Sequence, residues 1–228
     1  MRPPTARDMA NALRHMVALL VREDIAAPET SGNVEEAAAS LMSQGGKTGW
    51  SYRIDTSRPI VFAAVNHPKI GMIRPRVSAN VAVAESNDTH PPFKTLELSL
   101  EVTNDAGAPV QRWHVDRANE IENVYQQGPL YHLQSGGHWP DGARALEAQL
   151  EEPRWCHPPL DVILLTEVVV ANFYPDKWGV LHEVESWCSL VRESQRMCLA
   201  DYVQKVATLL NVGQSTALRE MWAEKWGV

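Results

Sequence analysis

Near the N-terminus, apolar residues recur every three or four positions, which is the spacing of one face of an amphipathic helix. The positions in question are Met9, Leu13, Met16, Val17, Leu20 and Val21. Thr5 precedes them as a candidate N-cap, and Asp8 follows three residues later as an imperfect capping box. The pattern predicts a helix from Thr5 to about Arg22 and a shorter one from Ser31 or Asn33 to Met42, before the stop at Gly45.

Between residues 49 and 135, alternation of apolar and polar residues replaces the helical spacing. The predicted strands are Trp50–Ile54, Pro59–Val65, Val77–Ala84, Thr95–Thr103, Val110–Asp116 and Pro129–Gln134. The strongest of these signals is a hairpin, in which Thr95–Thr103 and Val110–Asp116 flank turn residues at 104–107. We therefore expect an antiparallel meander of four to six strands.

Helical spacing returns after Gly136. A polar helix is expected at Asp141–Glu151, followed by a nearly all-apolar stretch at Leu160–Phe173. The β-branched residues of that stretch would permit a strand, but its length favours a buried helix. Beyond it, Asp176–Gln195 and Arg196–Leu210 are predicted as two helices or one continuous helix, and Ser215 caps a last helix through Trp226.

These elements predict a single α+β domain over residues 1–228. It comprises N-terminal helices in residues 5–44, a β-sheet in 49–135 and a C-terminal helical part in 141–228. The helices are expected to cover one face of the sheet and to leave the other face polar. The proline-rich residues 152–159 are expected to form a hinge between the β part and the helical part that follows it.

Composition and charge narrow the possible classes of function. The chain of 228 residues has a formal net charge of −7 at pH 7, so the charge does not favour nucleic acid as a partner. Cys156, Cys188 and Cys198 show no CxxC spacing, which favours a reducing compartment and a cytoplasmic protein. The sequence predicts no signal peptide, because the N-terminus lacks an uninterrupted apolar stretch after its basic residues. It predicts no membrane span, because no later segment reaches about 18 apolar residues.

Polar groups gather on one face of two predicted strands. Arg112, His114 and Asp116 alternate with Trp113 and Val115, so these three side chains share one face. If the next predicted strand is a neighbour with its apolar face aligned, the same face gains His132 and Gln134. Glu97 or Glu101 from the preceding strand would join them.

Two histidines with one or two carboxylates suit a divalent metal ion, or an acid/base pair acting on a phosphodiester. The metal ligands would be His114, Asp116 and His132, with His138 as a third nitrogen and Glu101 as an auxiliary group. Arg112 or Arg117 would stabilise developing negative charge. The simpler alternatives are a solvated sheet face and a surface that binds a partner.

Cys156 lies beside His157, and an adjacent imidazole can lower the pKa of a thiol. The order of N-terminal helix, meander, His-containing loop, cysteine and C-terminal helices resembles that of ubiquitin-conjugating enzymes. That family places a His-Pro-Asn tripeptide shortly before its cysteine, whereas here His138-Trp139-Pro140 lies well upstream and lacks the Asn. The resemblance implies that Cys156 is nucleophilic, and the alternative is a buried structural cysteine.

Two hypotheses of different classes follow. In the first, the chain is an interaction or accessory protein that presents a surface to a protein partner or to a second copy. Trp222 and Trp226 on the last helix would be its anchors. In the second, it is a metal-assisted hydrolase of a small phosphodiester, with His114, Asp116, His132 and Arg112 as the catalytic residues. The net charge makes a mononucleotide-sized substrate the better fit.

Overall fold

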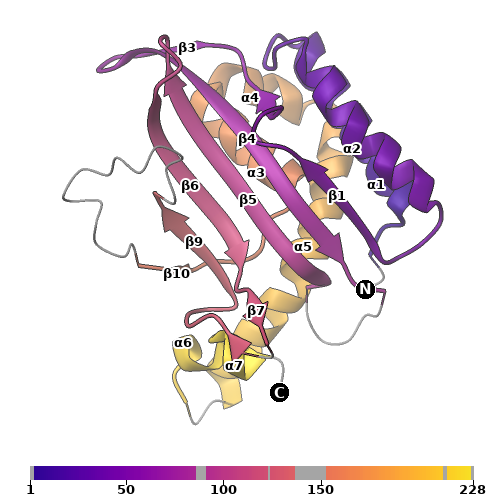
Figure 1. Ribbon diagram of the computed structural model, residues 1–228, viewed down its shortest axis with the longest axis vertical. Coiled ribbons are helices and arrows are strands. Elements are labelled where there is room, and N and C mark those ends of the chain that lie inside the picture. Colours follow the sequence, from indigo (N-terminus) through magenta and orange to yellow (C-terminus); the bar gives the residue numbers. More distant parts are fainter. Residues whose placement is uncertain (1–2, 86–90, 123, 137–152, 213–214, 227–228) are drawn as a thin grey trace.

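An antiparallel sheet with helices packed on one of its faces forms the protein (Figure 1). The computed structural model describes residues 3–85, 91–122, 124–136, 153–212 and 215–226. This arrangement is the predicted α+β class. The predicted helix Asp141–Glu151 lies outside the described residues, as does His138.

The two N-terminal helices follow the sequence pattern closely. Helix α1 (Ala6–Arg22) begins at a complete capping box, in which Thr5 and Asp8 each bond the other's backbone N–H. Helix α2 (Thr30–Gln44) ends at Gly45, whose φ of 70° lies in the left-handed region that favours glycine. Both helices bury the apolar stripe that predicted them.

The sheet has eight strands in the described residues, more than the expected four to six. Their bounds are β1 (Trp50–Ile54), β2 (Ile60–Val61), β3 (Val65–His67), β4 (Gly71–Val83), β5 (Phe93–Asn104), β6 (Pro109–Arg117), β9 (Tyr131–Ser135) and β10 (Trp155–Cys156). The main path runs β1-β4-β5-β6-β9-β10, and β2 and β3 pair with β4 beside β1. A separate small ribbon pairs β7 (Glu120–Ile121) with β8 (Val124–Tyr125).

Two strand predictions are corrected. The expected strand Pro59–Val65 is divided into β2 and β3, because Ala63 between them donates its N–H to the carbonyl of Ile25 at 2.8 Å instead of pairing with β4. Residues 155–156 form β10 against β9, so this part of the expected hinge belongs to the sheet.

The C-terminal part contains α3 (Val162–Phe173), α4 (Pro175–His182), α5 (Glu185–Val212), α6 (Ala217–Glu220) and α7 (Ala223–Trp226). The apolar stretch is thus a helix, as its length predicted. The next helical run breaks at residues 183–184 rather than near 195. Leu181 and Trp187 are both fully buried. In one continuous helix, a separation of six residues would point their side chains in widely different directions. The break therefore lets both side chains face the core.

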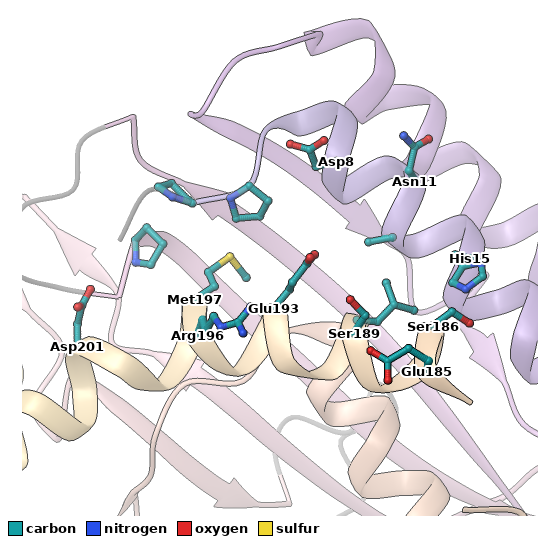
Figure 2. A pocket seen from close by; sticks show the side chains of 15 residues that line it. Asp8, Asn11, His15, Glu185, Ser186, Ser189, Glu193, Arg196, Met197 and Asp201 are labelled. Carbon is teal, nitrogen blue, oxygen red and sulfur yellow. The ribbon is translucent and has the colours of Figure 1, made fainter. Parts of the chain in front are cut away.

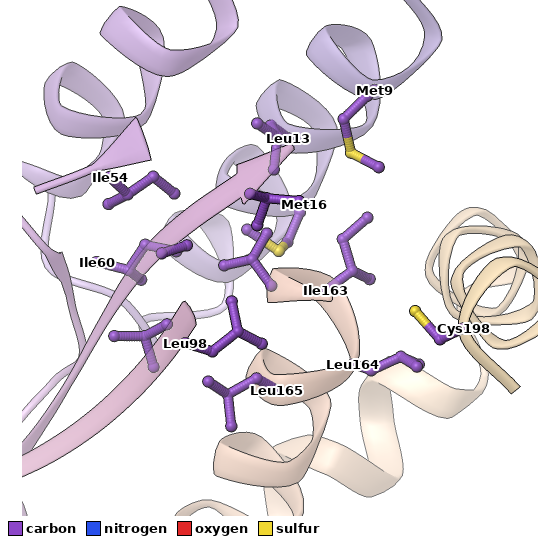
Figure 3. Close-up of a cluster of buried hydrophobic side chains, with 14 of the residues drawn as sticks. Met9, Leu13, Met16, Ile54, Ile60, Leu98, Ile163, Leu164, Leu165 and Cys198 are labelled. Atoms are coloured by element: carbon purple, nitrogen blue, oxygen red, sulfur yellow. The ribbon is translucent and has the colours of Figure 1, made fainter. Parts of the chain in front are cut away.

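Helix α3 lies directly against the central strands of the sheet. It packs against β4, β5 and α5, and Figure 1 shows α3 and α5 on the same side of the sheet. Around it, Leu13 and Met16 of α1, Leu98 of β5 and Ile163 of α3 form part of one buried cluster (Figure 3). The cluster draws on the N-terminal helices, the sheet and the C-terminal helices together.

A buried carboxylate caps α3 and joins it to α5. Asp161, 1 % exposed, accepts hydrogen bonds from the Leu164 N–H at 2.9 Å and from the Ser194 hydroxyl at 2.7 Å. Burial raises the pKa of Asp161, while these hydrogen bonds act in the opposite direction. The two contacts fix the start of α3 against the middle of α5.

We expect Asp161→Ala to lower the free energy of unfolding by about 2–4 kcal/mol, because it removes an N-cap and leaves buried donors unpaired. Chemical denaturation measures the change. Thr216→Ala is the matched control, since Thr216 caps the exposed helix α6, and it should cost less than about 1 kcal/mol. Equal losses in the two variants would show that the Asp161 contacts add nothing beyond ordinary capping.

Candidate functional site

The strand register places a row of polar side chains across the face of the sheet opposite α3. Paired residues follow one another from β1 to β9 in the order Arg53, Asn80, Glu97, Asp116, His132. Residues directly opposite on neighbouring antiparallel strands have Cβ atoms about 4.5–5.5 Å apart. Chain segments far apart in sequence therefore contribute to one continuous polar row.

A second row lies beside the first, with Ser78, Ser99, His114 and Gln134 in register. The prediction that β6 and β9 are neighbours, with Arg112, His114, Asp116, His132 and Gln134 on a shared face, is therefore confirmed. Glu97 joins them directly, because it stands opposite Asp116. Glu101 stands opposite Arg112 and forms an ion pair with Arg76 at 3.8 Å, outside the lining of the cavity described next.

This face is hollowed into a cavity of about 400 Å³. Both polar rows contribute to its wall, and Asn119 and Gln126 line it from the segment around β7 and β8. A volume of this size lies within the range of ordinary small-molecule sites. The sheet thus provides a concave polar site of small-molecule size.

Four arginines converge on the cavity: Arg53, Arg112, Arg117 and Arg154. Arg112 donates from Nε to the Ser99 hydroxyl at 3.0 Å. Arg117 donates to the Lys94 carbonyl at 3.3 Å and lies over the ring of Tyr125. Two carboxylic side chains, Glu97 and Asp116, line the same cavity, so positive groups prevail there although the whole chain is acidic.

Arg154 reaches the cavity because residues 155–156 pair with β9, which sequence reasoning missed. Its guanidinium donates to the carbonyl of Gln127, and its side chain lies over Gly128. Gly128 has a φ of 138°, and a Cβ there would meet the Arg154 Cδ at 3.1 Å. The only sequence signals for this arrangement are the glycine and the Trp155-Cys156 pair.

Three buried polar atoms of residues in this wall have no hydrogen-bond partner among the described residues: Nε2 of His114, Oδ1 of Asp116 and Nε of Arg117. An unsatisfied buried polar atom costs about 1–3 kcal/mol, and native structures contain few of them. Of these residues, His114 and Asp116 lie on the cavity side of β6, two positions apart. An imidazole nitrogen and a carboxyl oxygen thus lie without a partner just below the surface of the wall.

The cavity reverses the usual order of protonation of these two groups. Burial, together with the charge of Glu97, raises the pKa of Asp116 from the ordinary 3.8 to about 7. Burial, together with the charge of Arg112, lowers the pKa of His114 from the ordinary 6.5 to about 4. Near neutral pH the imidazole is uncharged, and a substantial fraction of Asp116 carries a proton.

His132 is 2 % exposed and shares this behaviour. Its pKa is lowered to about 4, chiefly by burial. Its Nδ1 lies 3.2 Å from the carbonyl oxygen of Pro129, so the neutral ring donates there. In this neutral imidazole, which stands opposite Asp116, Nε2 is the ring nitrogen that carries no proton.

The predicted metal site is not assembled by the residues that can be placed. Within the described ranges, no group of three or more His, Cys, Asp or Glu side chains is arranged to hold a metal ion. His114 and His132 are staggered along β6 and β9, because His114 stands opposite Gln134 and His132 stands opposite Asp116. The proposed third nitrogen, His138, lies outside the described residues.

Cys156 is exposed at the sheet edge, and so is not the buried cysteine that sequence analysis offered as an alternative. Its Sγ lies 3.3 Å from the Tyr202 hydroxyl of α5. The Nδ1 of His157 lies 2.6 Å from the carbonyl oxygen of Pro158. The neighbouring thiol and imidazole thus each contact a different group.

The two C-terminal tryptophans differ from their predicted role as surface anchors. They do not share one helix, since Trp222 lies between α6 and α7. Trp226 is 1 % exposed and packs edge-on against Tyr131 and stacked on Tyr202, with ring centroids 5.6 and 5.7 Å apart. Trp222 is half-buried and bridges Pro129. The aromatic ring of Trp226 therefore stabilises the fold rather than a partner contact.

A second cavity, of about 950 Å³, lies elsewhere, between the start of α1 and the side of α5 (Figure 2). Its charged lining is mainly acidic, with Asp8, Glu185, Glu193 and Asp201 against Arg196. Asp8 is already held in the capping box of α1. None of its lining residues is among the described side chains that bury an unpartnered polar atom, so we assign no site there.

We expect Trp226→Ala to lower the free energy of unfolding by about 3–5 kcal/mol, the usual cost of deleting a large buried aromatic side chain. Trp155→Ala is the matched control, because Trp155 is 66 % exposed, and it should cost less than about 1 kcal/mol. Urea denaturation measures both changes. A negligible loss for Trp226→Ala would return this residue to the role of a surface anchor.

The raised pKa of Asp116 makes stability depend on pH. The folded chain holds this proton more tightly than the unfolded chain, so Asp116 lowers stability as the pH rises from about 4 to about 7. The side chain of Asp116→Asn does not ionise. The free energy of unfolding of this variant should therefore rise by about 3 kcal/mol relative to that of the wild type between about pH 4 and about pH 7. Asp105→Asn, in the exposed β5–β6 turn, is the control. A constant difference between wild type and Asp116→Asn would contradict the raised pKa.

The chain was also compared with known proteins. No model of a protein family, no curated protein and no solved structure matches it. None of the helices in the described part of the chain has both the length and the apolar character needed to cross a membrane. The assignment of a function therefore depends on the site itself.

Proposed function

We propose that the polar face of the sheet is the binding site of a small organic anion that carries a phosphate group. The observation that carries the proposal is the pair of unpartnered buried atoms on His114 and Asp116, in a cavity that four arginines line. Guanidinium groups match the geometry of phosphate and carboxylate oxygens. A ligand with anionic oxygens and a further polar group would satisfy both sets of protein groups.

The charge and size of the cavity narrow the ligand class. A volume of about 400 Å³ accommodates a molecule of about mononucleotide size. The formal net charge of −7 disfavours a long polyanion, because binding to an extended phosphate backbone depends on a broad basic surface. The local excess of arginine over carboxylate favours a compact anion held within the cavity.

Two predictions from the sequence stay predictions. The first is that the chain is an interaction protein for a protein partner or a second copy; of its two expected anchors, only Trp222 retains an exposed part. The second is a cytoplasmic location, which the three free cysteines support.

We expect pyrophosphate to bind the wild-type chain, and Arg112→Gln to weaken binding at least about tenfold, which corresponds to about 1.4 kcal/mol. Isothermal titration calorimetry measures both affinities. Arg154→Gln serves as a second variant in case Arg112→Gln disturbs the sheet. Arg192→Gln is the matched control, since Arg192 lies on α5 and pairs with Glu185.

Two results of this titration would overturn the proposal. If the wild type fails to bind pyrophosphate, or if Arg192→Gln weakens binding as much as Arg112→Gln and Arg154→Gln do, the cavity is not the anion site. Far-UV circular dichroism on each variant verifies that the fold is retained.

A further inference from the structure

We infer that Asp116 and His114 act as proton donor and proton acceptor in the hydrolysis of a phosphodiester held in the cavity. This inference rests on the proposed anion site and adds a reaction to it. It assigns the two residues opposite roles in one step, whereas the sequence offered both as metal ligands or as undifferentiated acid and base.

The placement of the two groups suits a single reacting centre between them. They lie on the same face of β6 with one residue between them, which separates their Cα atoms by about 7 Å in an extended strand. Displacement at phosphorus needs a base beside the attacking oxygen and an acid beside the leaving oxygen, each within about 2.6–3.2 Å. Two side chains that diverge from positions about 7 Å apart can reach the two opposite oxygens of one phosphorus atom.

Hydrogen bonding indicates which ring nitrogen of His114 carries the proton. The ring bonds the backbone of Gly136, and Nε2 has no partner among the described residues. The bond to Gly136 is therefore made by Nδ1, which donates its proton to the backbone carbonyl. Nε2 is left with the lone pair of the neutral ring, as a proton acceptor requires.

The surroundings of Asp116 keep a proton on its carboxyl group. Glu97 of β5 stands opposite it on one side and the uncharged His132 of β9 on the other. The positive charges of Arg112 and Arg154 act in the opposite direction but do not prevail over burial and Glu97. Glu97 is itself held by Asn80, whose amide donates to its Oε2 at 2.8 Å, so Glu97 acts on Asp116 as a positioning residue.

The reaction balances with water as the only co-reactant. His114 Nε2 accepts a proton from water as the water oxygen forms a bond to phosphorus. The bond from phosphorus to the leaving oxygen breaks, and that oxygen takes the proton of Asp116. The products are a phosphomonoester and an alcohol, and return of the proton from the imidazolium to the carboxylate restores the starting state.

The cavity arginines supply the remaining requirement of the step. Negative charge develops on the non-bridging oxygens of the phosphoryl group during displacement, and cations aimed at these oxygens lower the barrier. Arg112 precedes His114 by two residues on the same face of β6, and Arg154 enters from beside β10. The same guanidiniums that hold the anion thus stabilise its transition state.

The test uses the full chain with bis(p-nitrophenyl) phosphate as substrate, in buffer that contains EDTA. We expect turnover by the wild type, and a loss of at least about 100-fold in kcat for both Asp116→Asn and His114→Ala. Far-UV circular dichroism verifies that both variants retain the fold. Asp105→Asn, a carboxylate in the exposed β5–β6 turn, should turn over like the wild type.

The pH profile supplies a readout that a structural role would not produce. The kcat/KM of the wild type should fall as the pH rises above about 7, where Asp116 loses its proton. The residual activity of Asp116→Asn should lack this alkaline limb.

The outcomes separate this inference from the proposed function. If pyrophosphate binds but the diester is not hydrolysed in EDTA, the proton-transfer inference is wrong and the anion site stands. If pyrophosphate does not bind, both are wrong. Retention of full kcat in either Asp116→Asn or His114→Ala would also overturn the inference.

Discussion

The burial of α3 against the apolar face of the central strands is the interaction on which the rest of the structure depends. Helix α3 is apolar nearly all round, so it is stable in water only when it is covered on every side. The sheet covers one side, and α1 and α5 are part of the same buried cluster. Because the helices are needed on that face, the other face of the sheet stays free to carry polar groups.

The register of the strands then turns that polar face into a site. A shift of one residue in any pairing would exchange the two faces of a strand. Leu98 and Val115 would leave the core, and Asp116 would lose its position opposite Glu97. The same hydrophobic burial that stabilises the fold therefore also fixes the order of the polar row.

The chemical character of the site comes from proximity in a partly buried space. Burial and the charge of Glu97 make Asp116 harder to ionise, and burial and the charge of Arg112 make His114 harder to protonate. These effects act in the same cavity. As a result, a carboxyl group with a raised pKa and an imidazole with a lowered pKa lie two residues apart. Groups whose pKa values are displaced in this way are common at functional sites.

Much of the site could be predicted from the sequence, because alternation with a period of two assigns strand residues to faces. Arg112, His114 and Asp116 follow from that rule alone, and His132 follows once β6 and β9 are taken as neighbours. Arg53, Asn80 and Arg154 could not be predicted. Their places depend on pairing with strands distant in the chain and, for Arg154, on a short strand of only two residues.

The sequence by itself determined the two N-terminal helices, the β5–β6 hairpin and the helical state of the stretch before Tyr174, because local periodicity, capping and length decide these features. The predicted last helix, capped by Ser215, is instead α6 and α7, and Thr216 caps α6. Only the tertiary structure decided that Trp226 is buried, where the long helical run breaks, and which strands meet across the cavity. Those outcomes depend on contacts between distant segments, whose free energies no local pattern records.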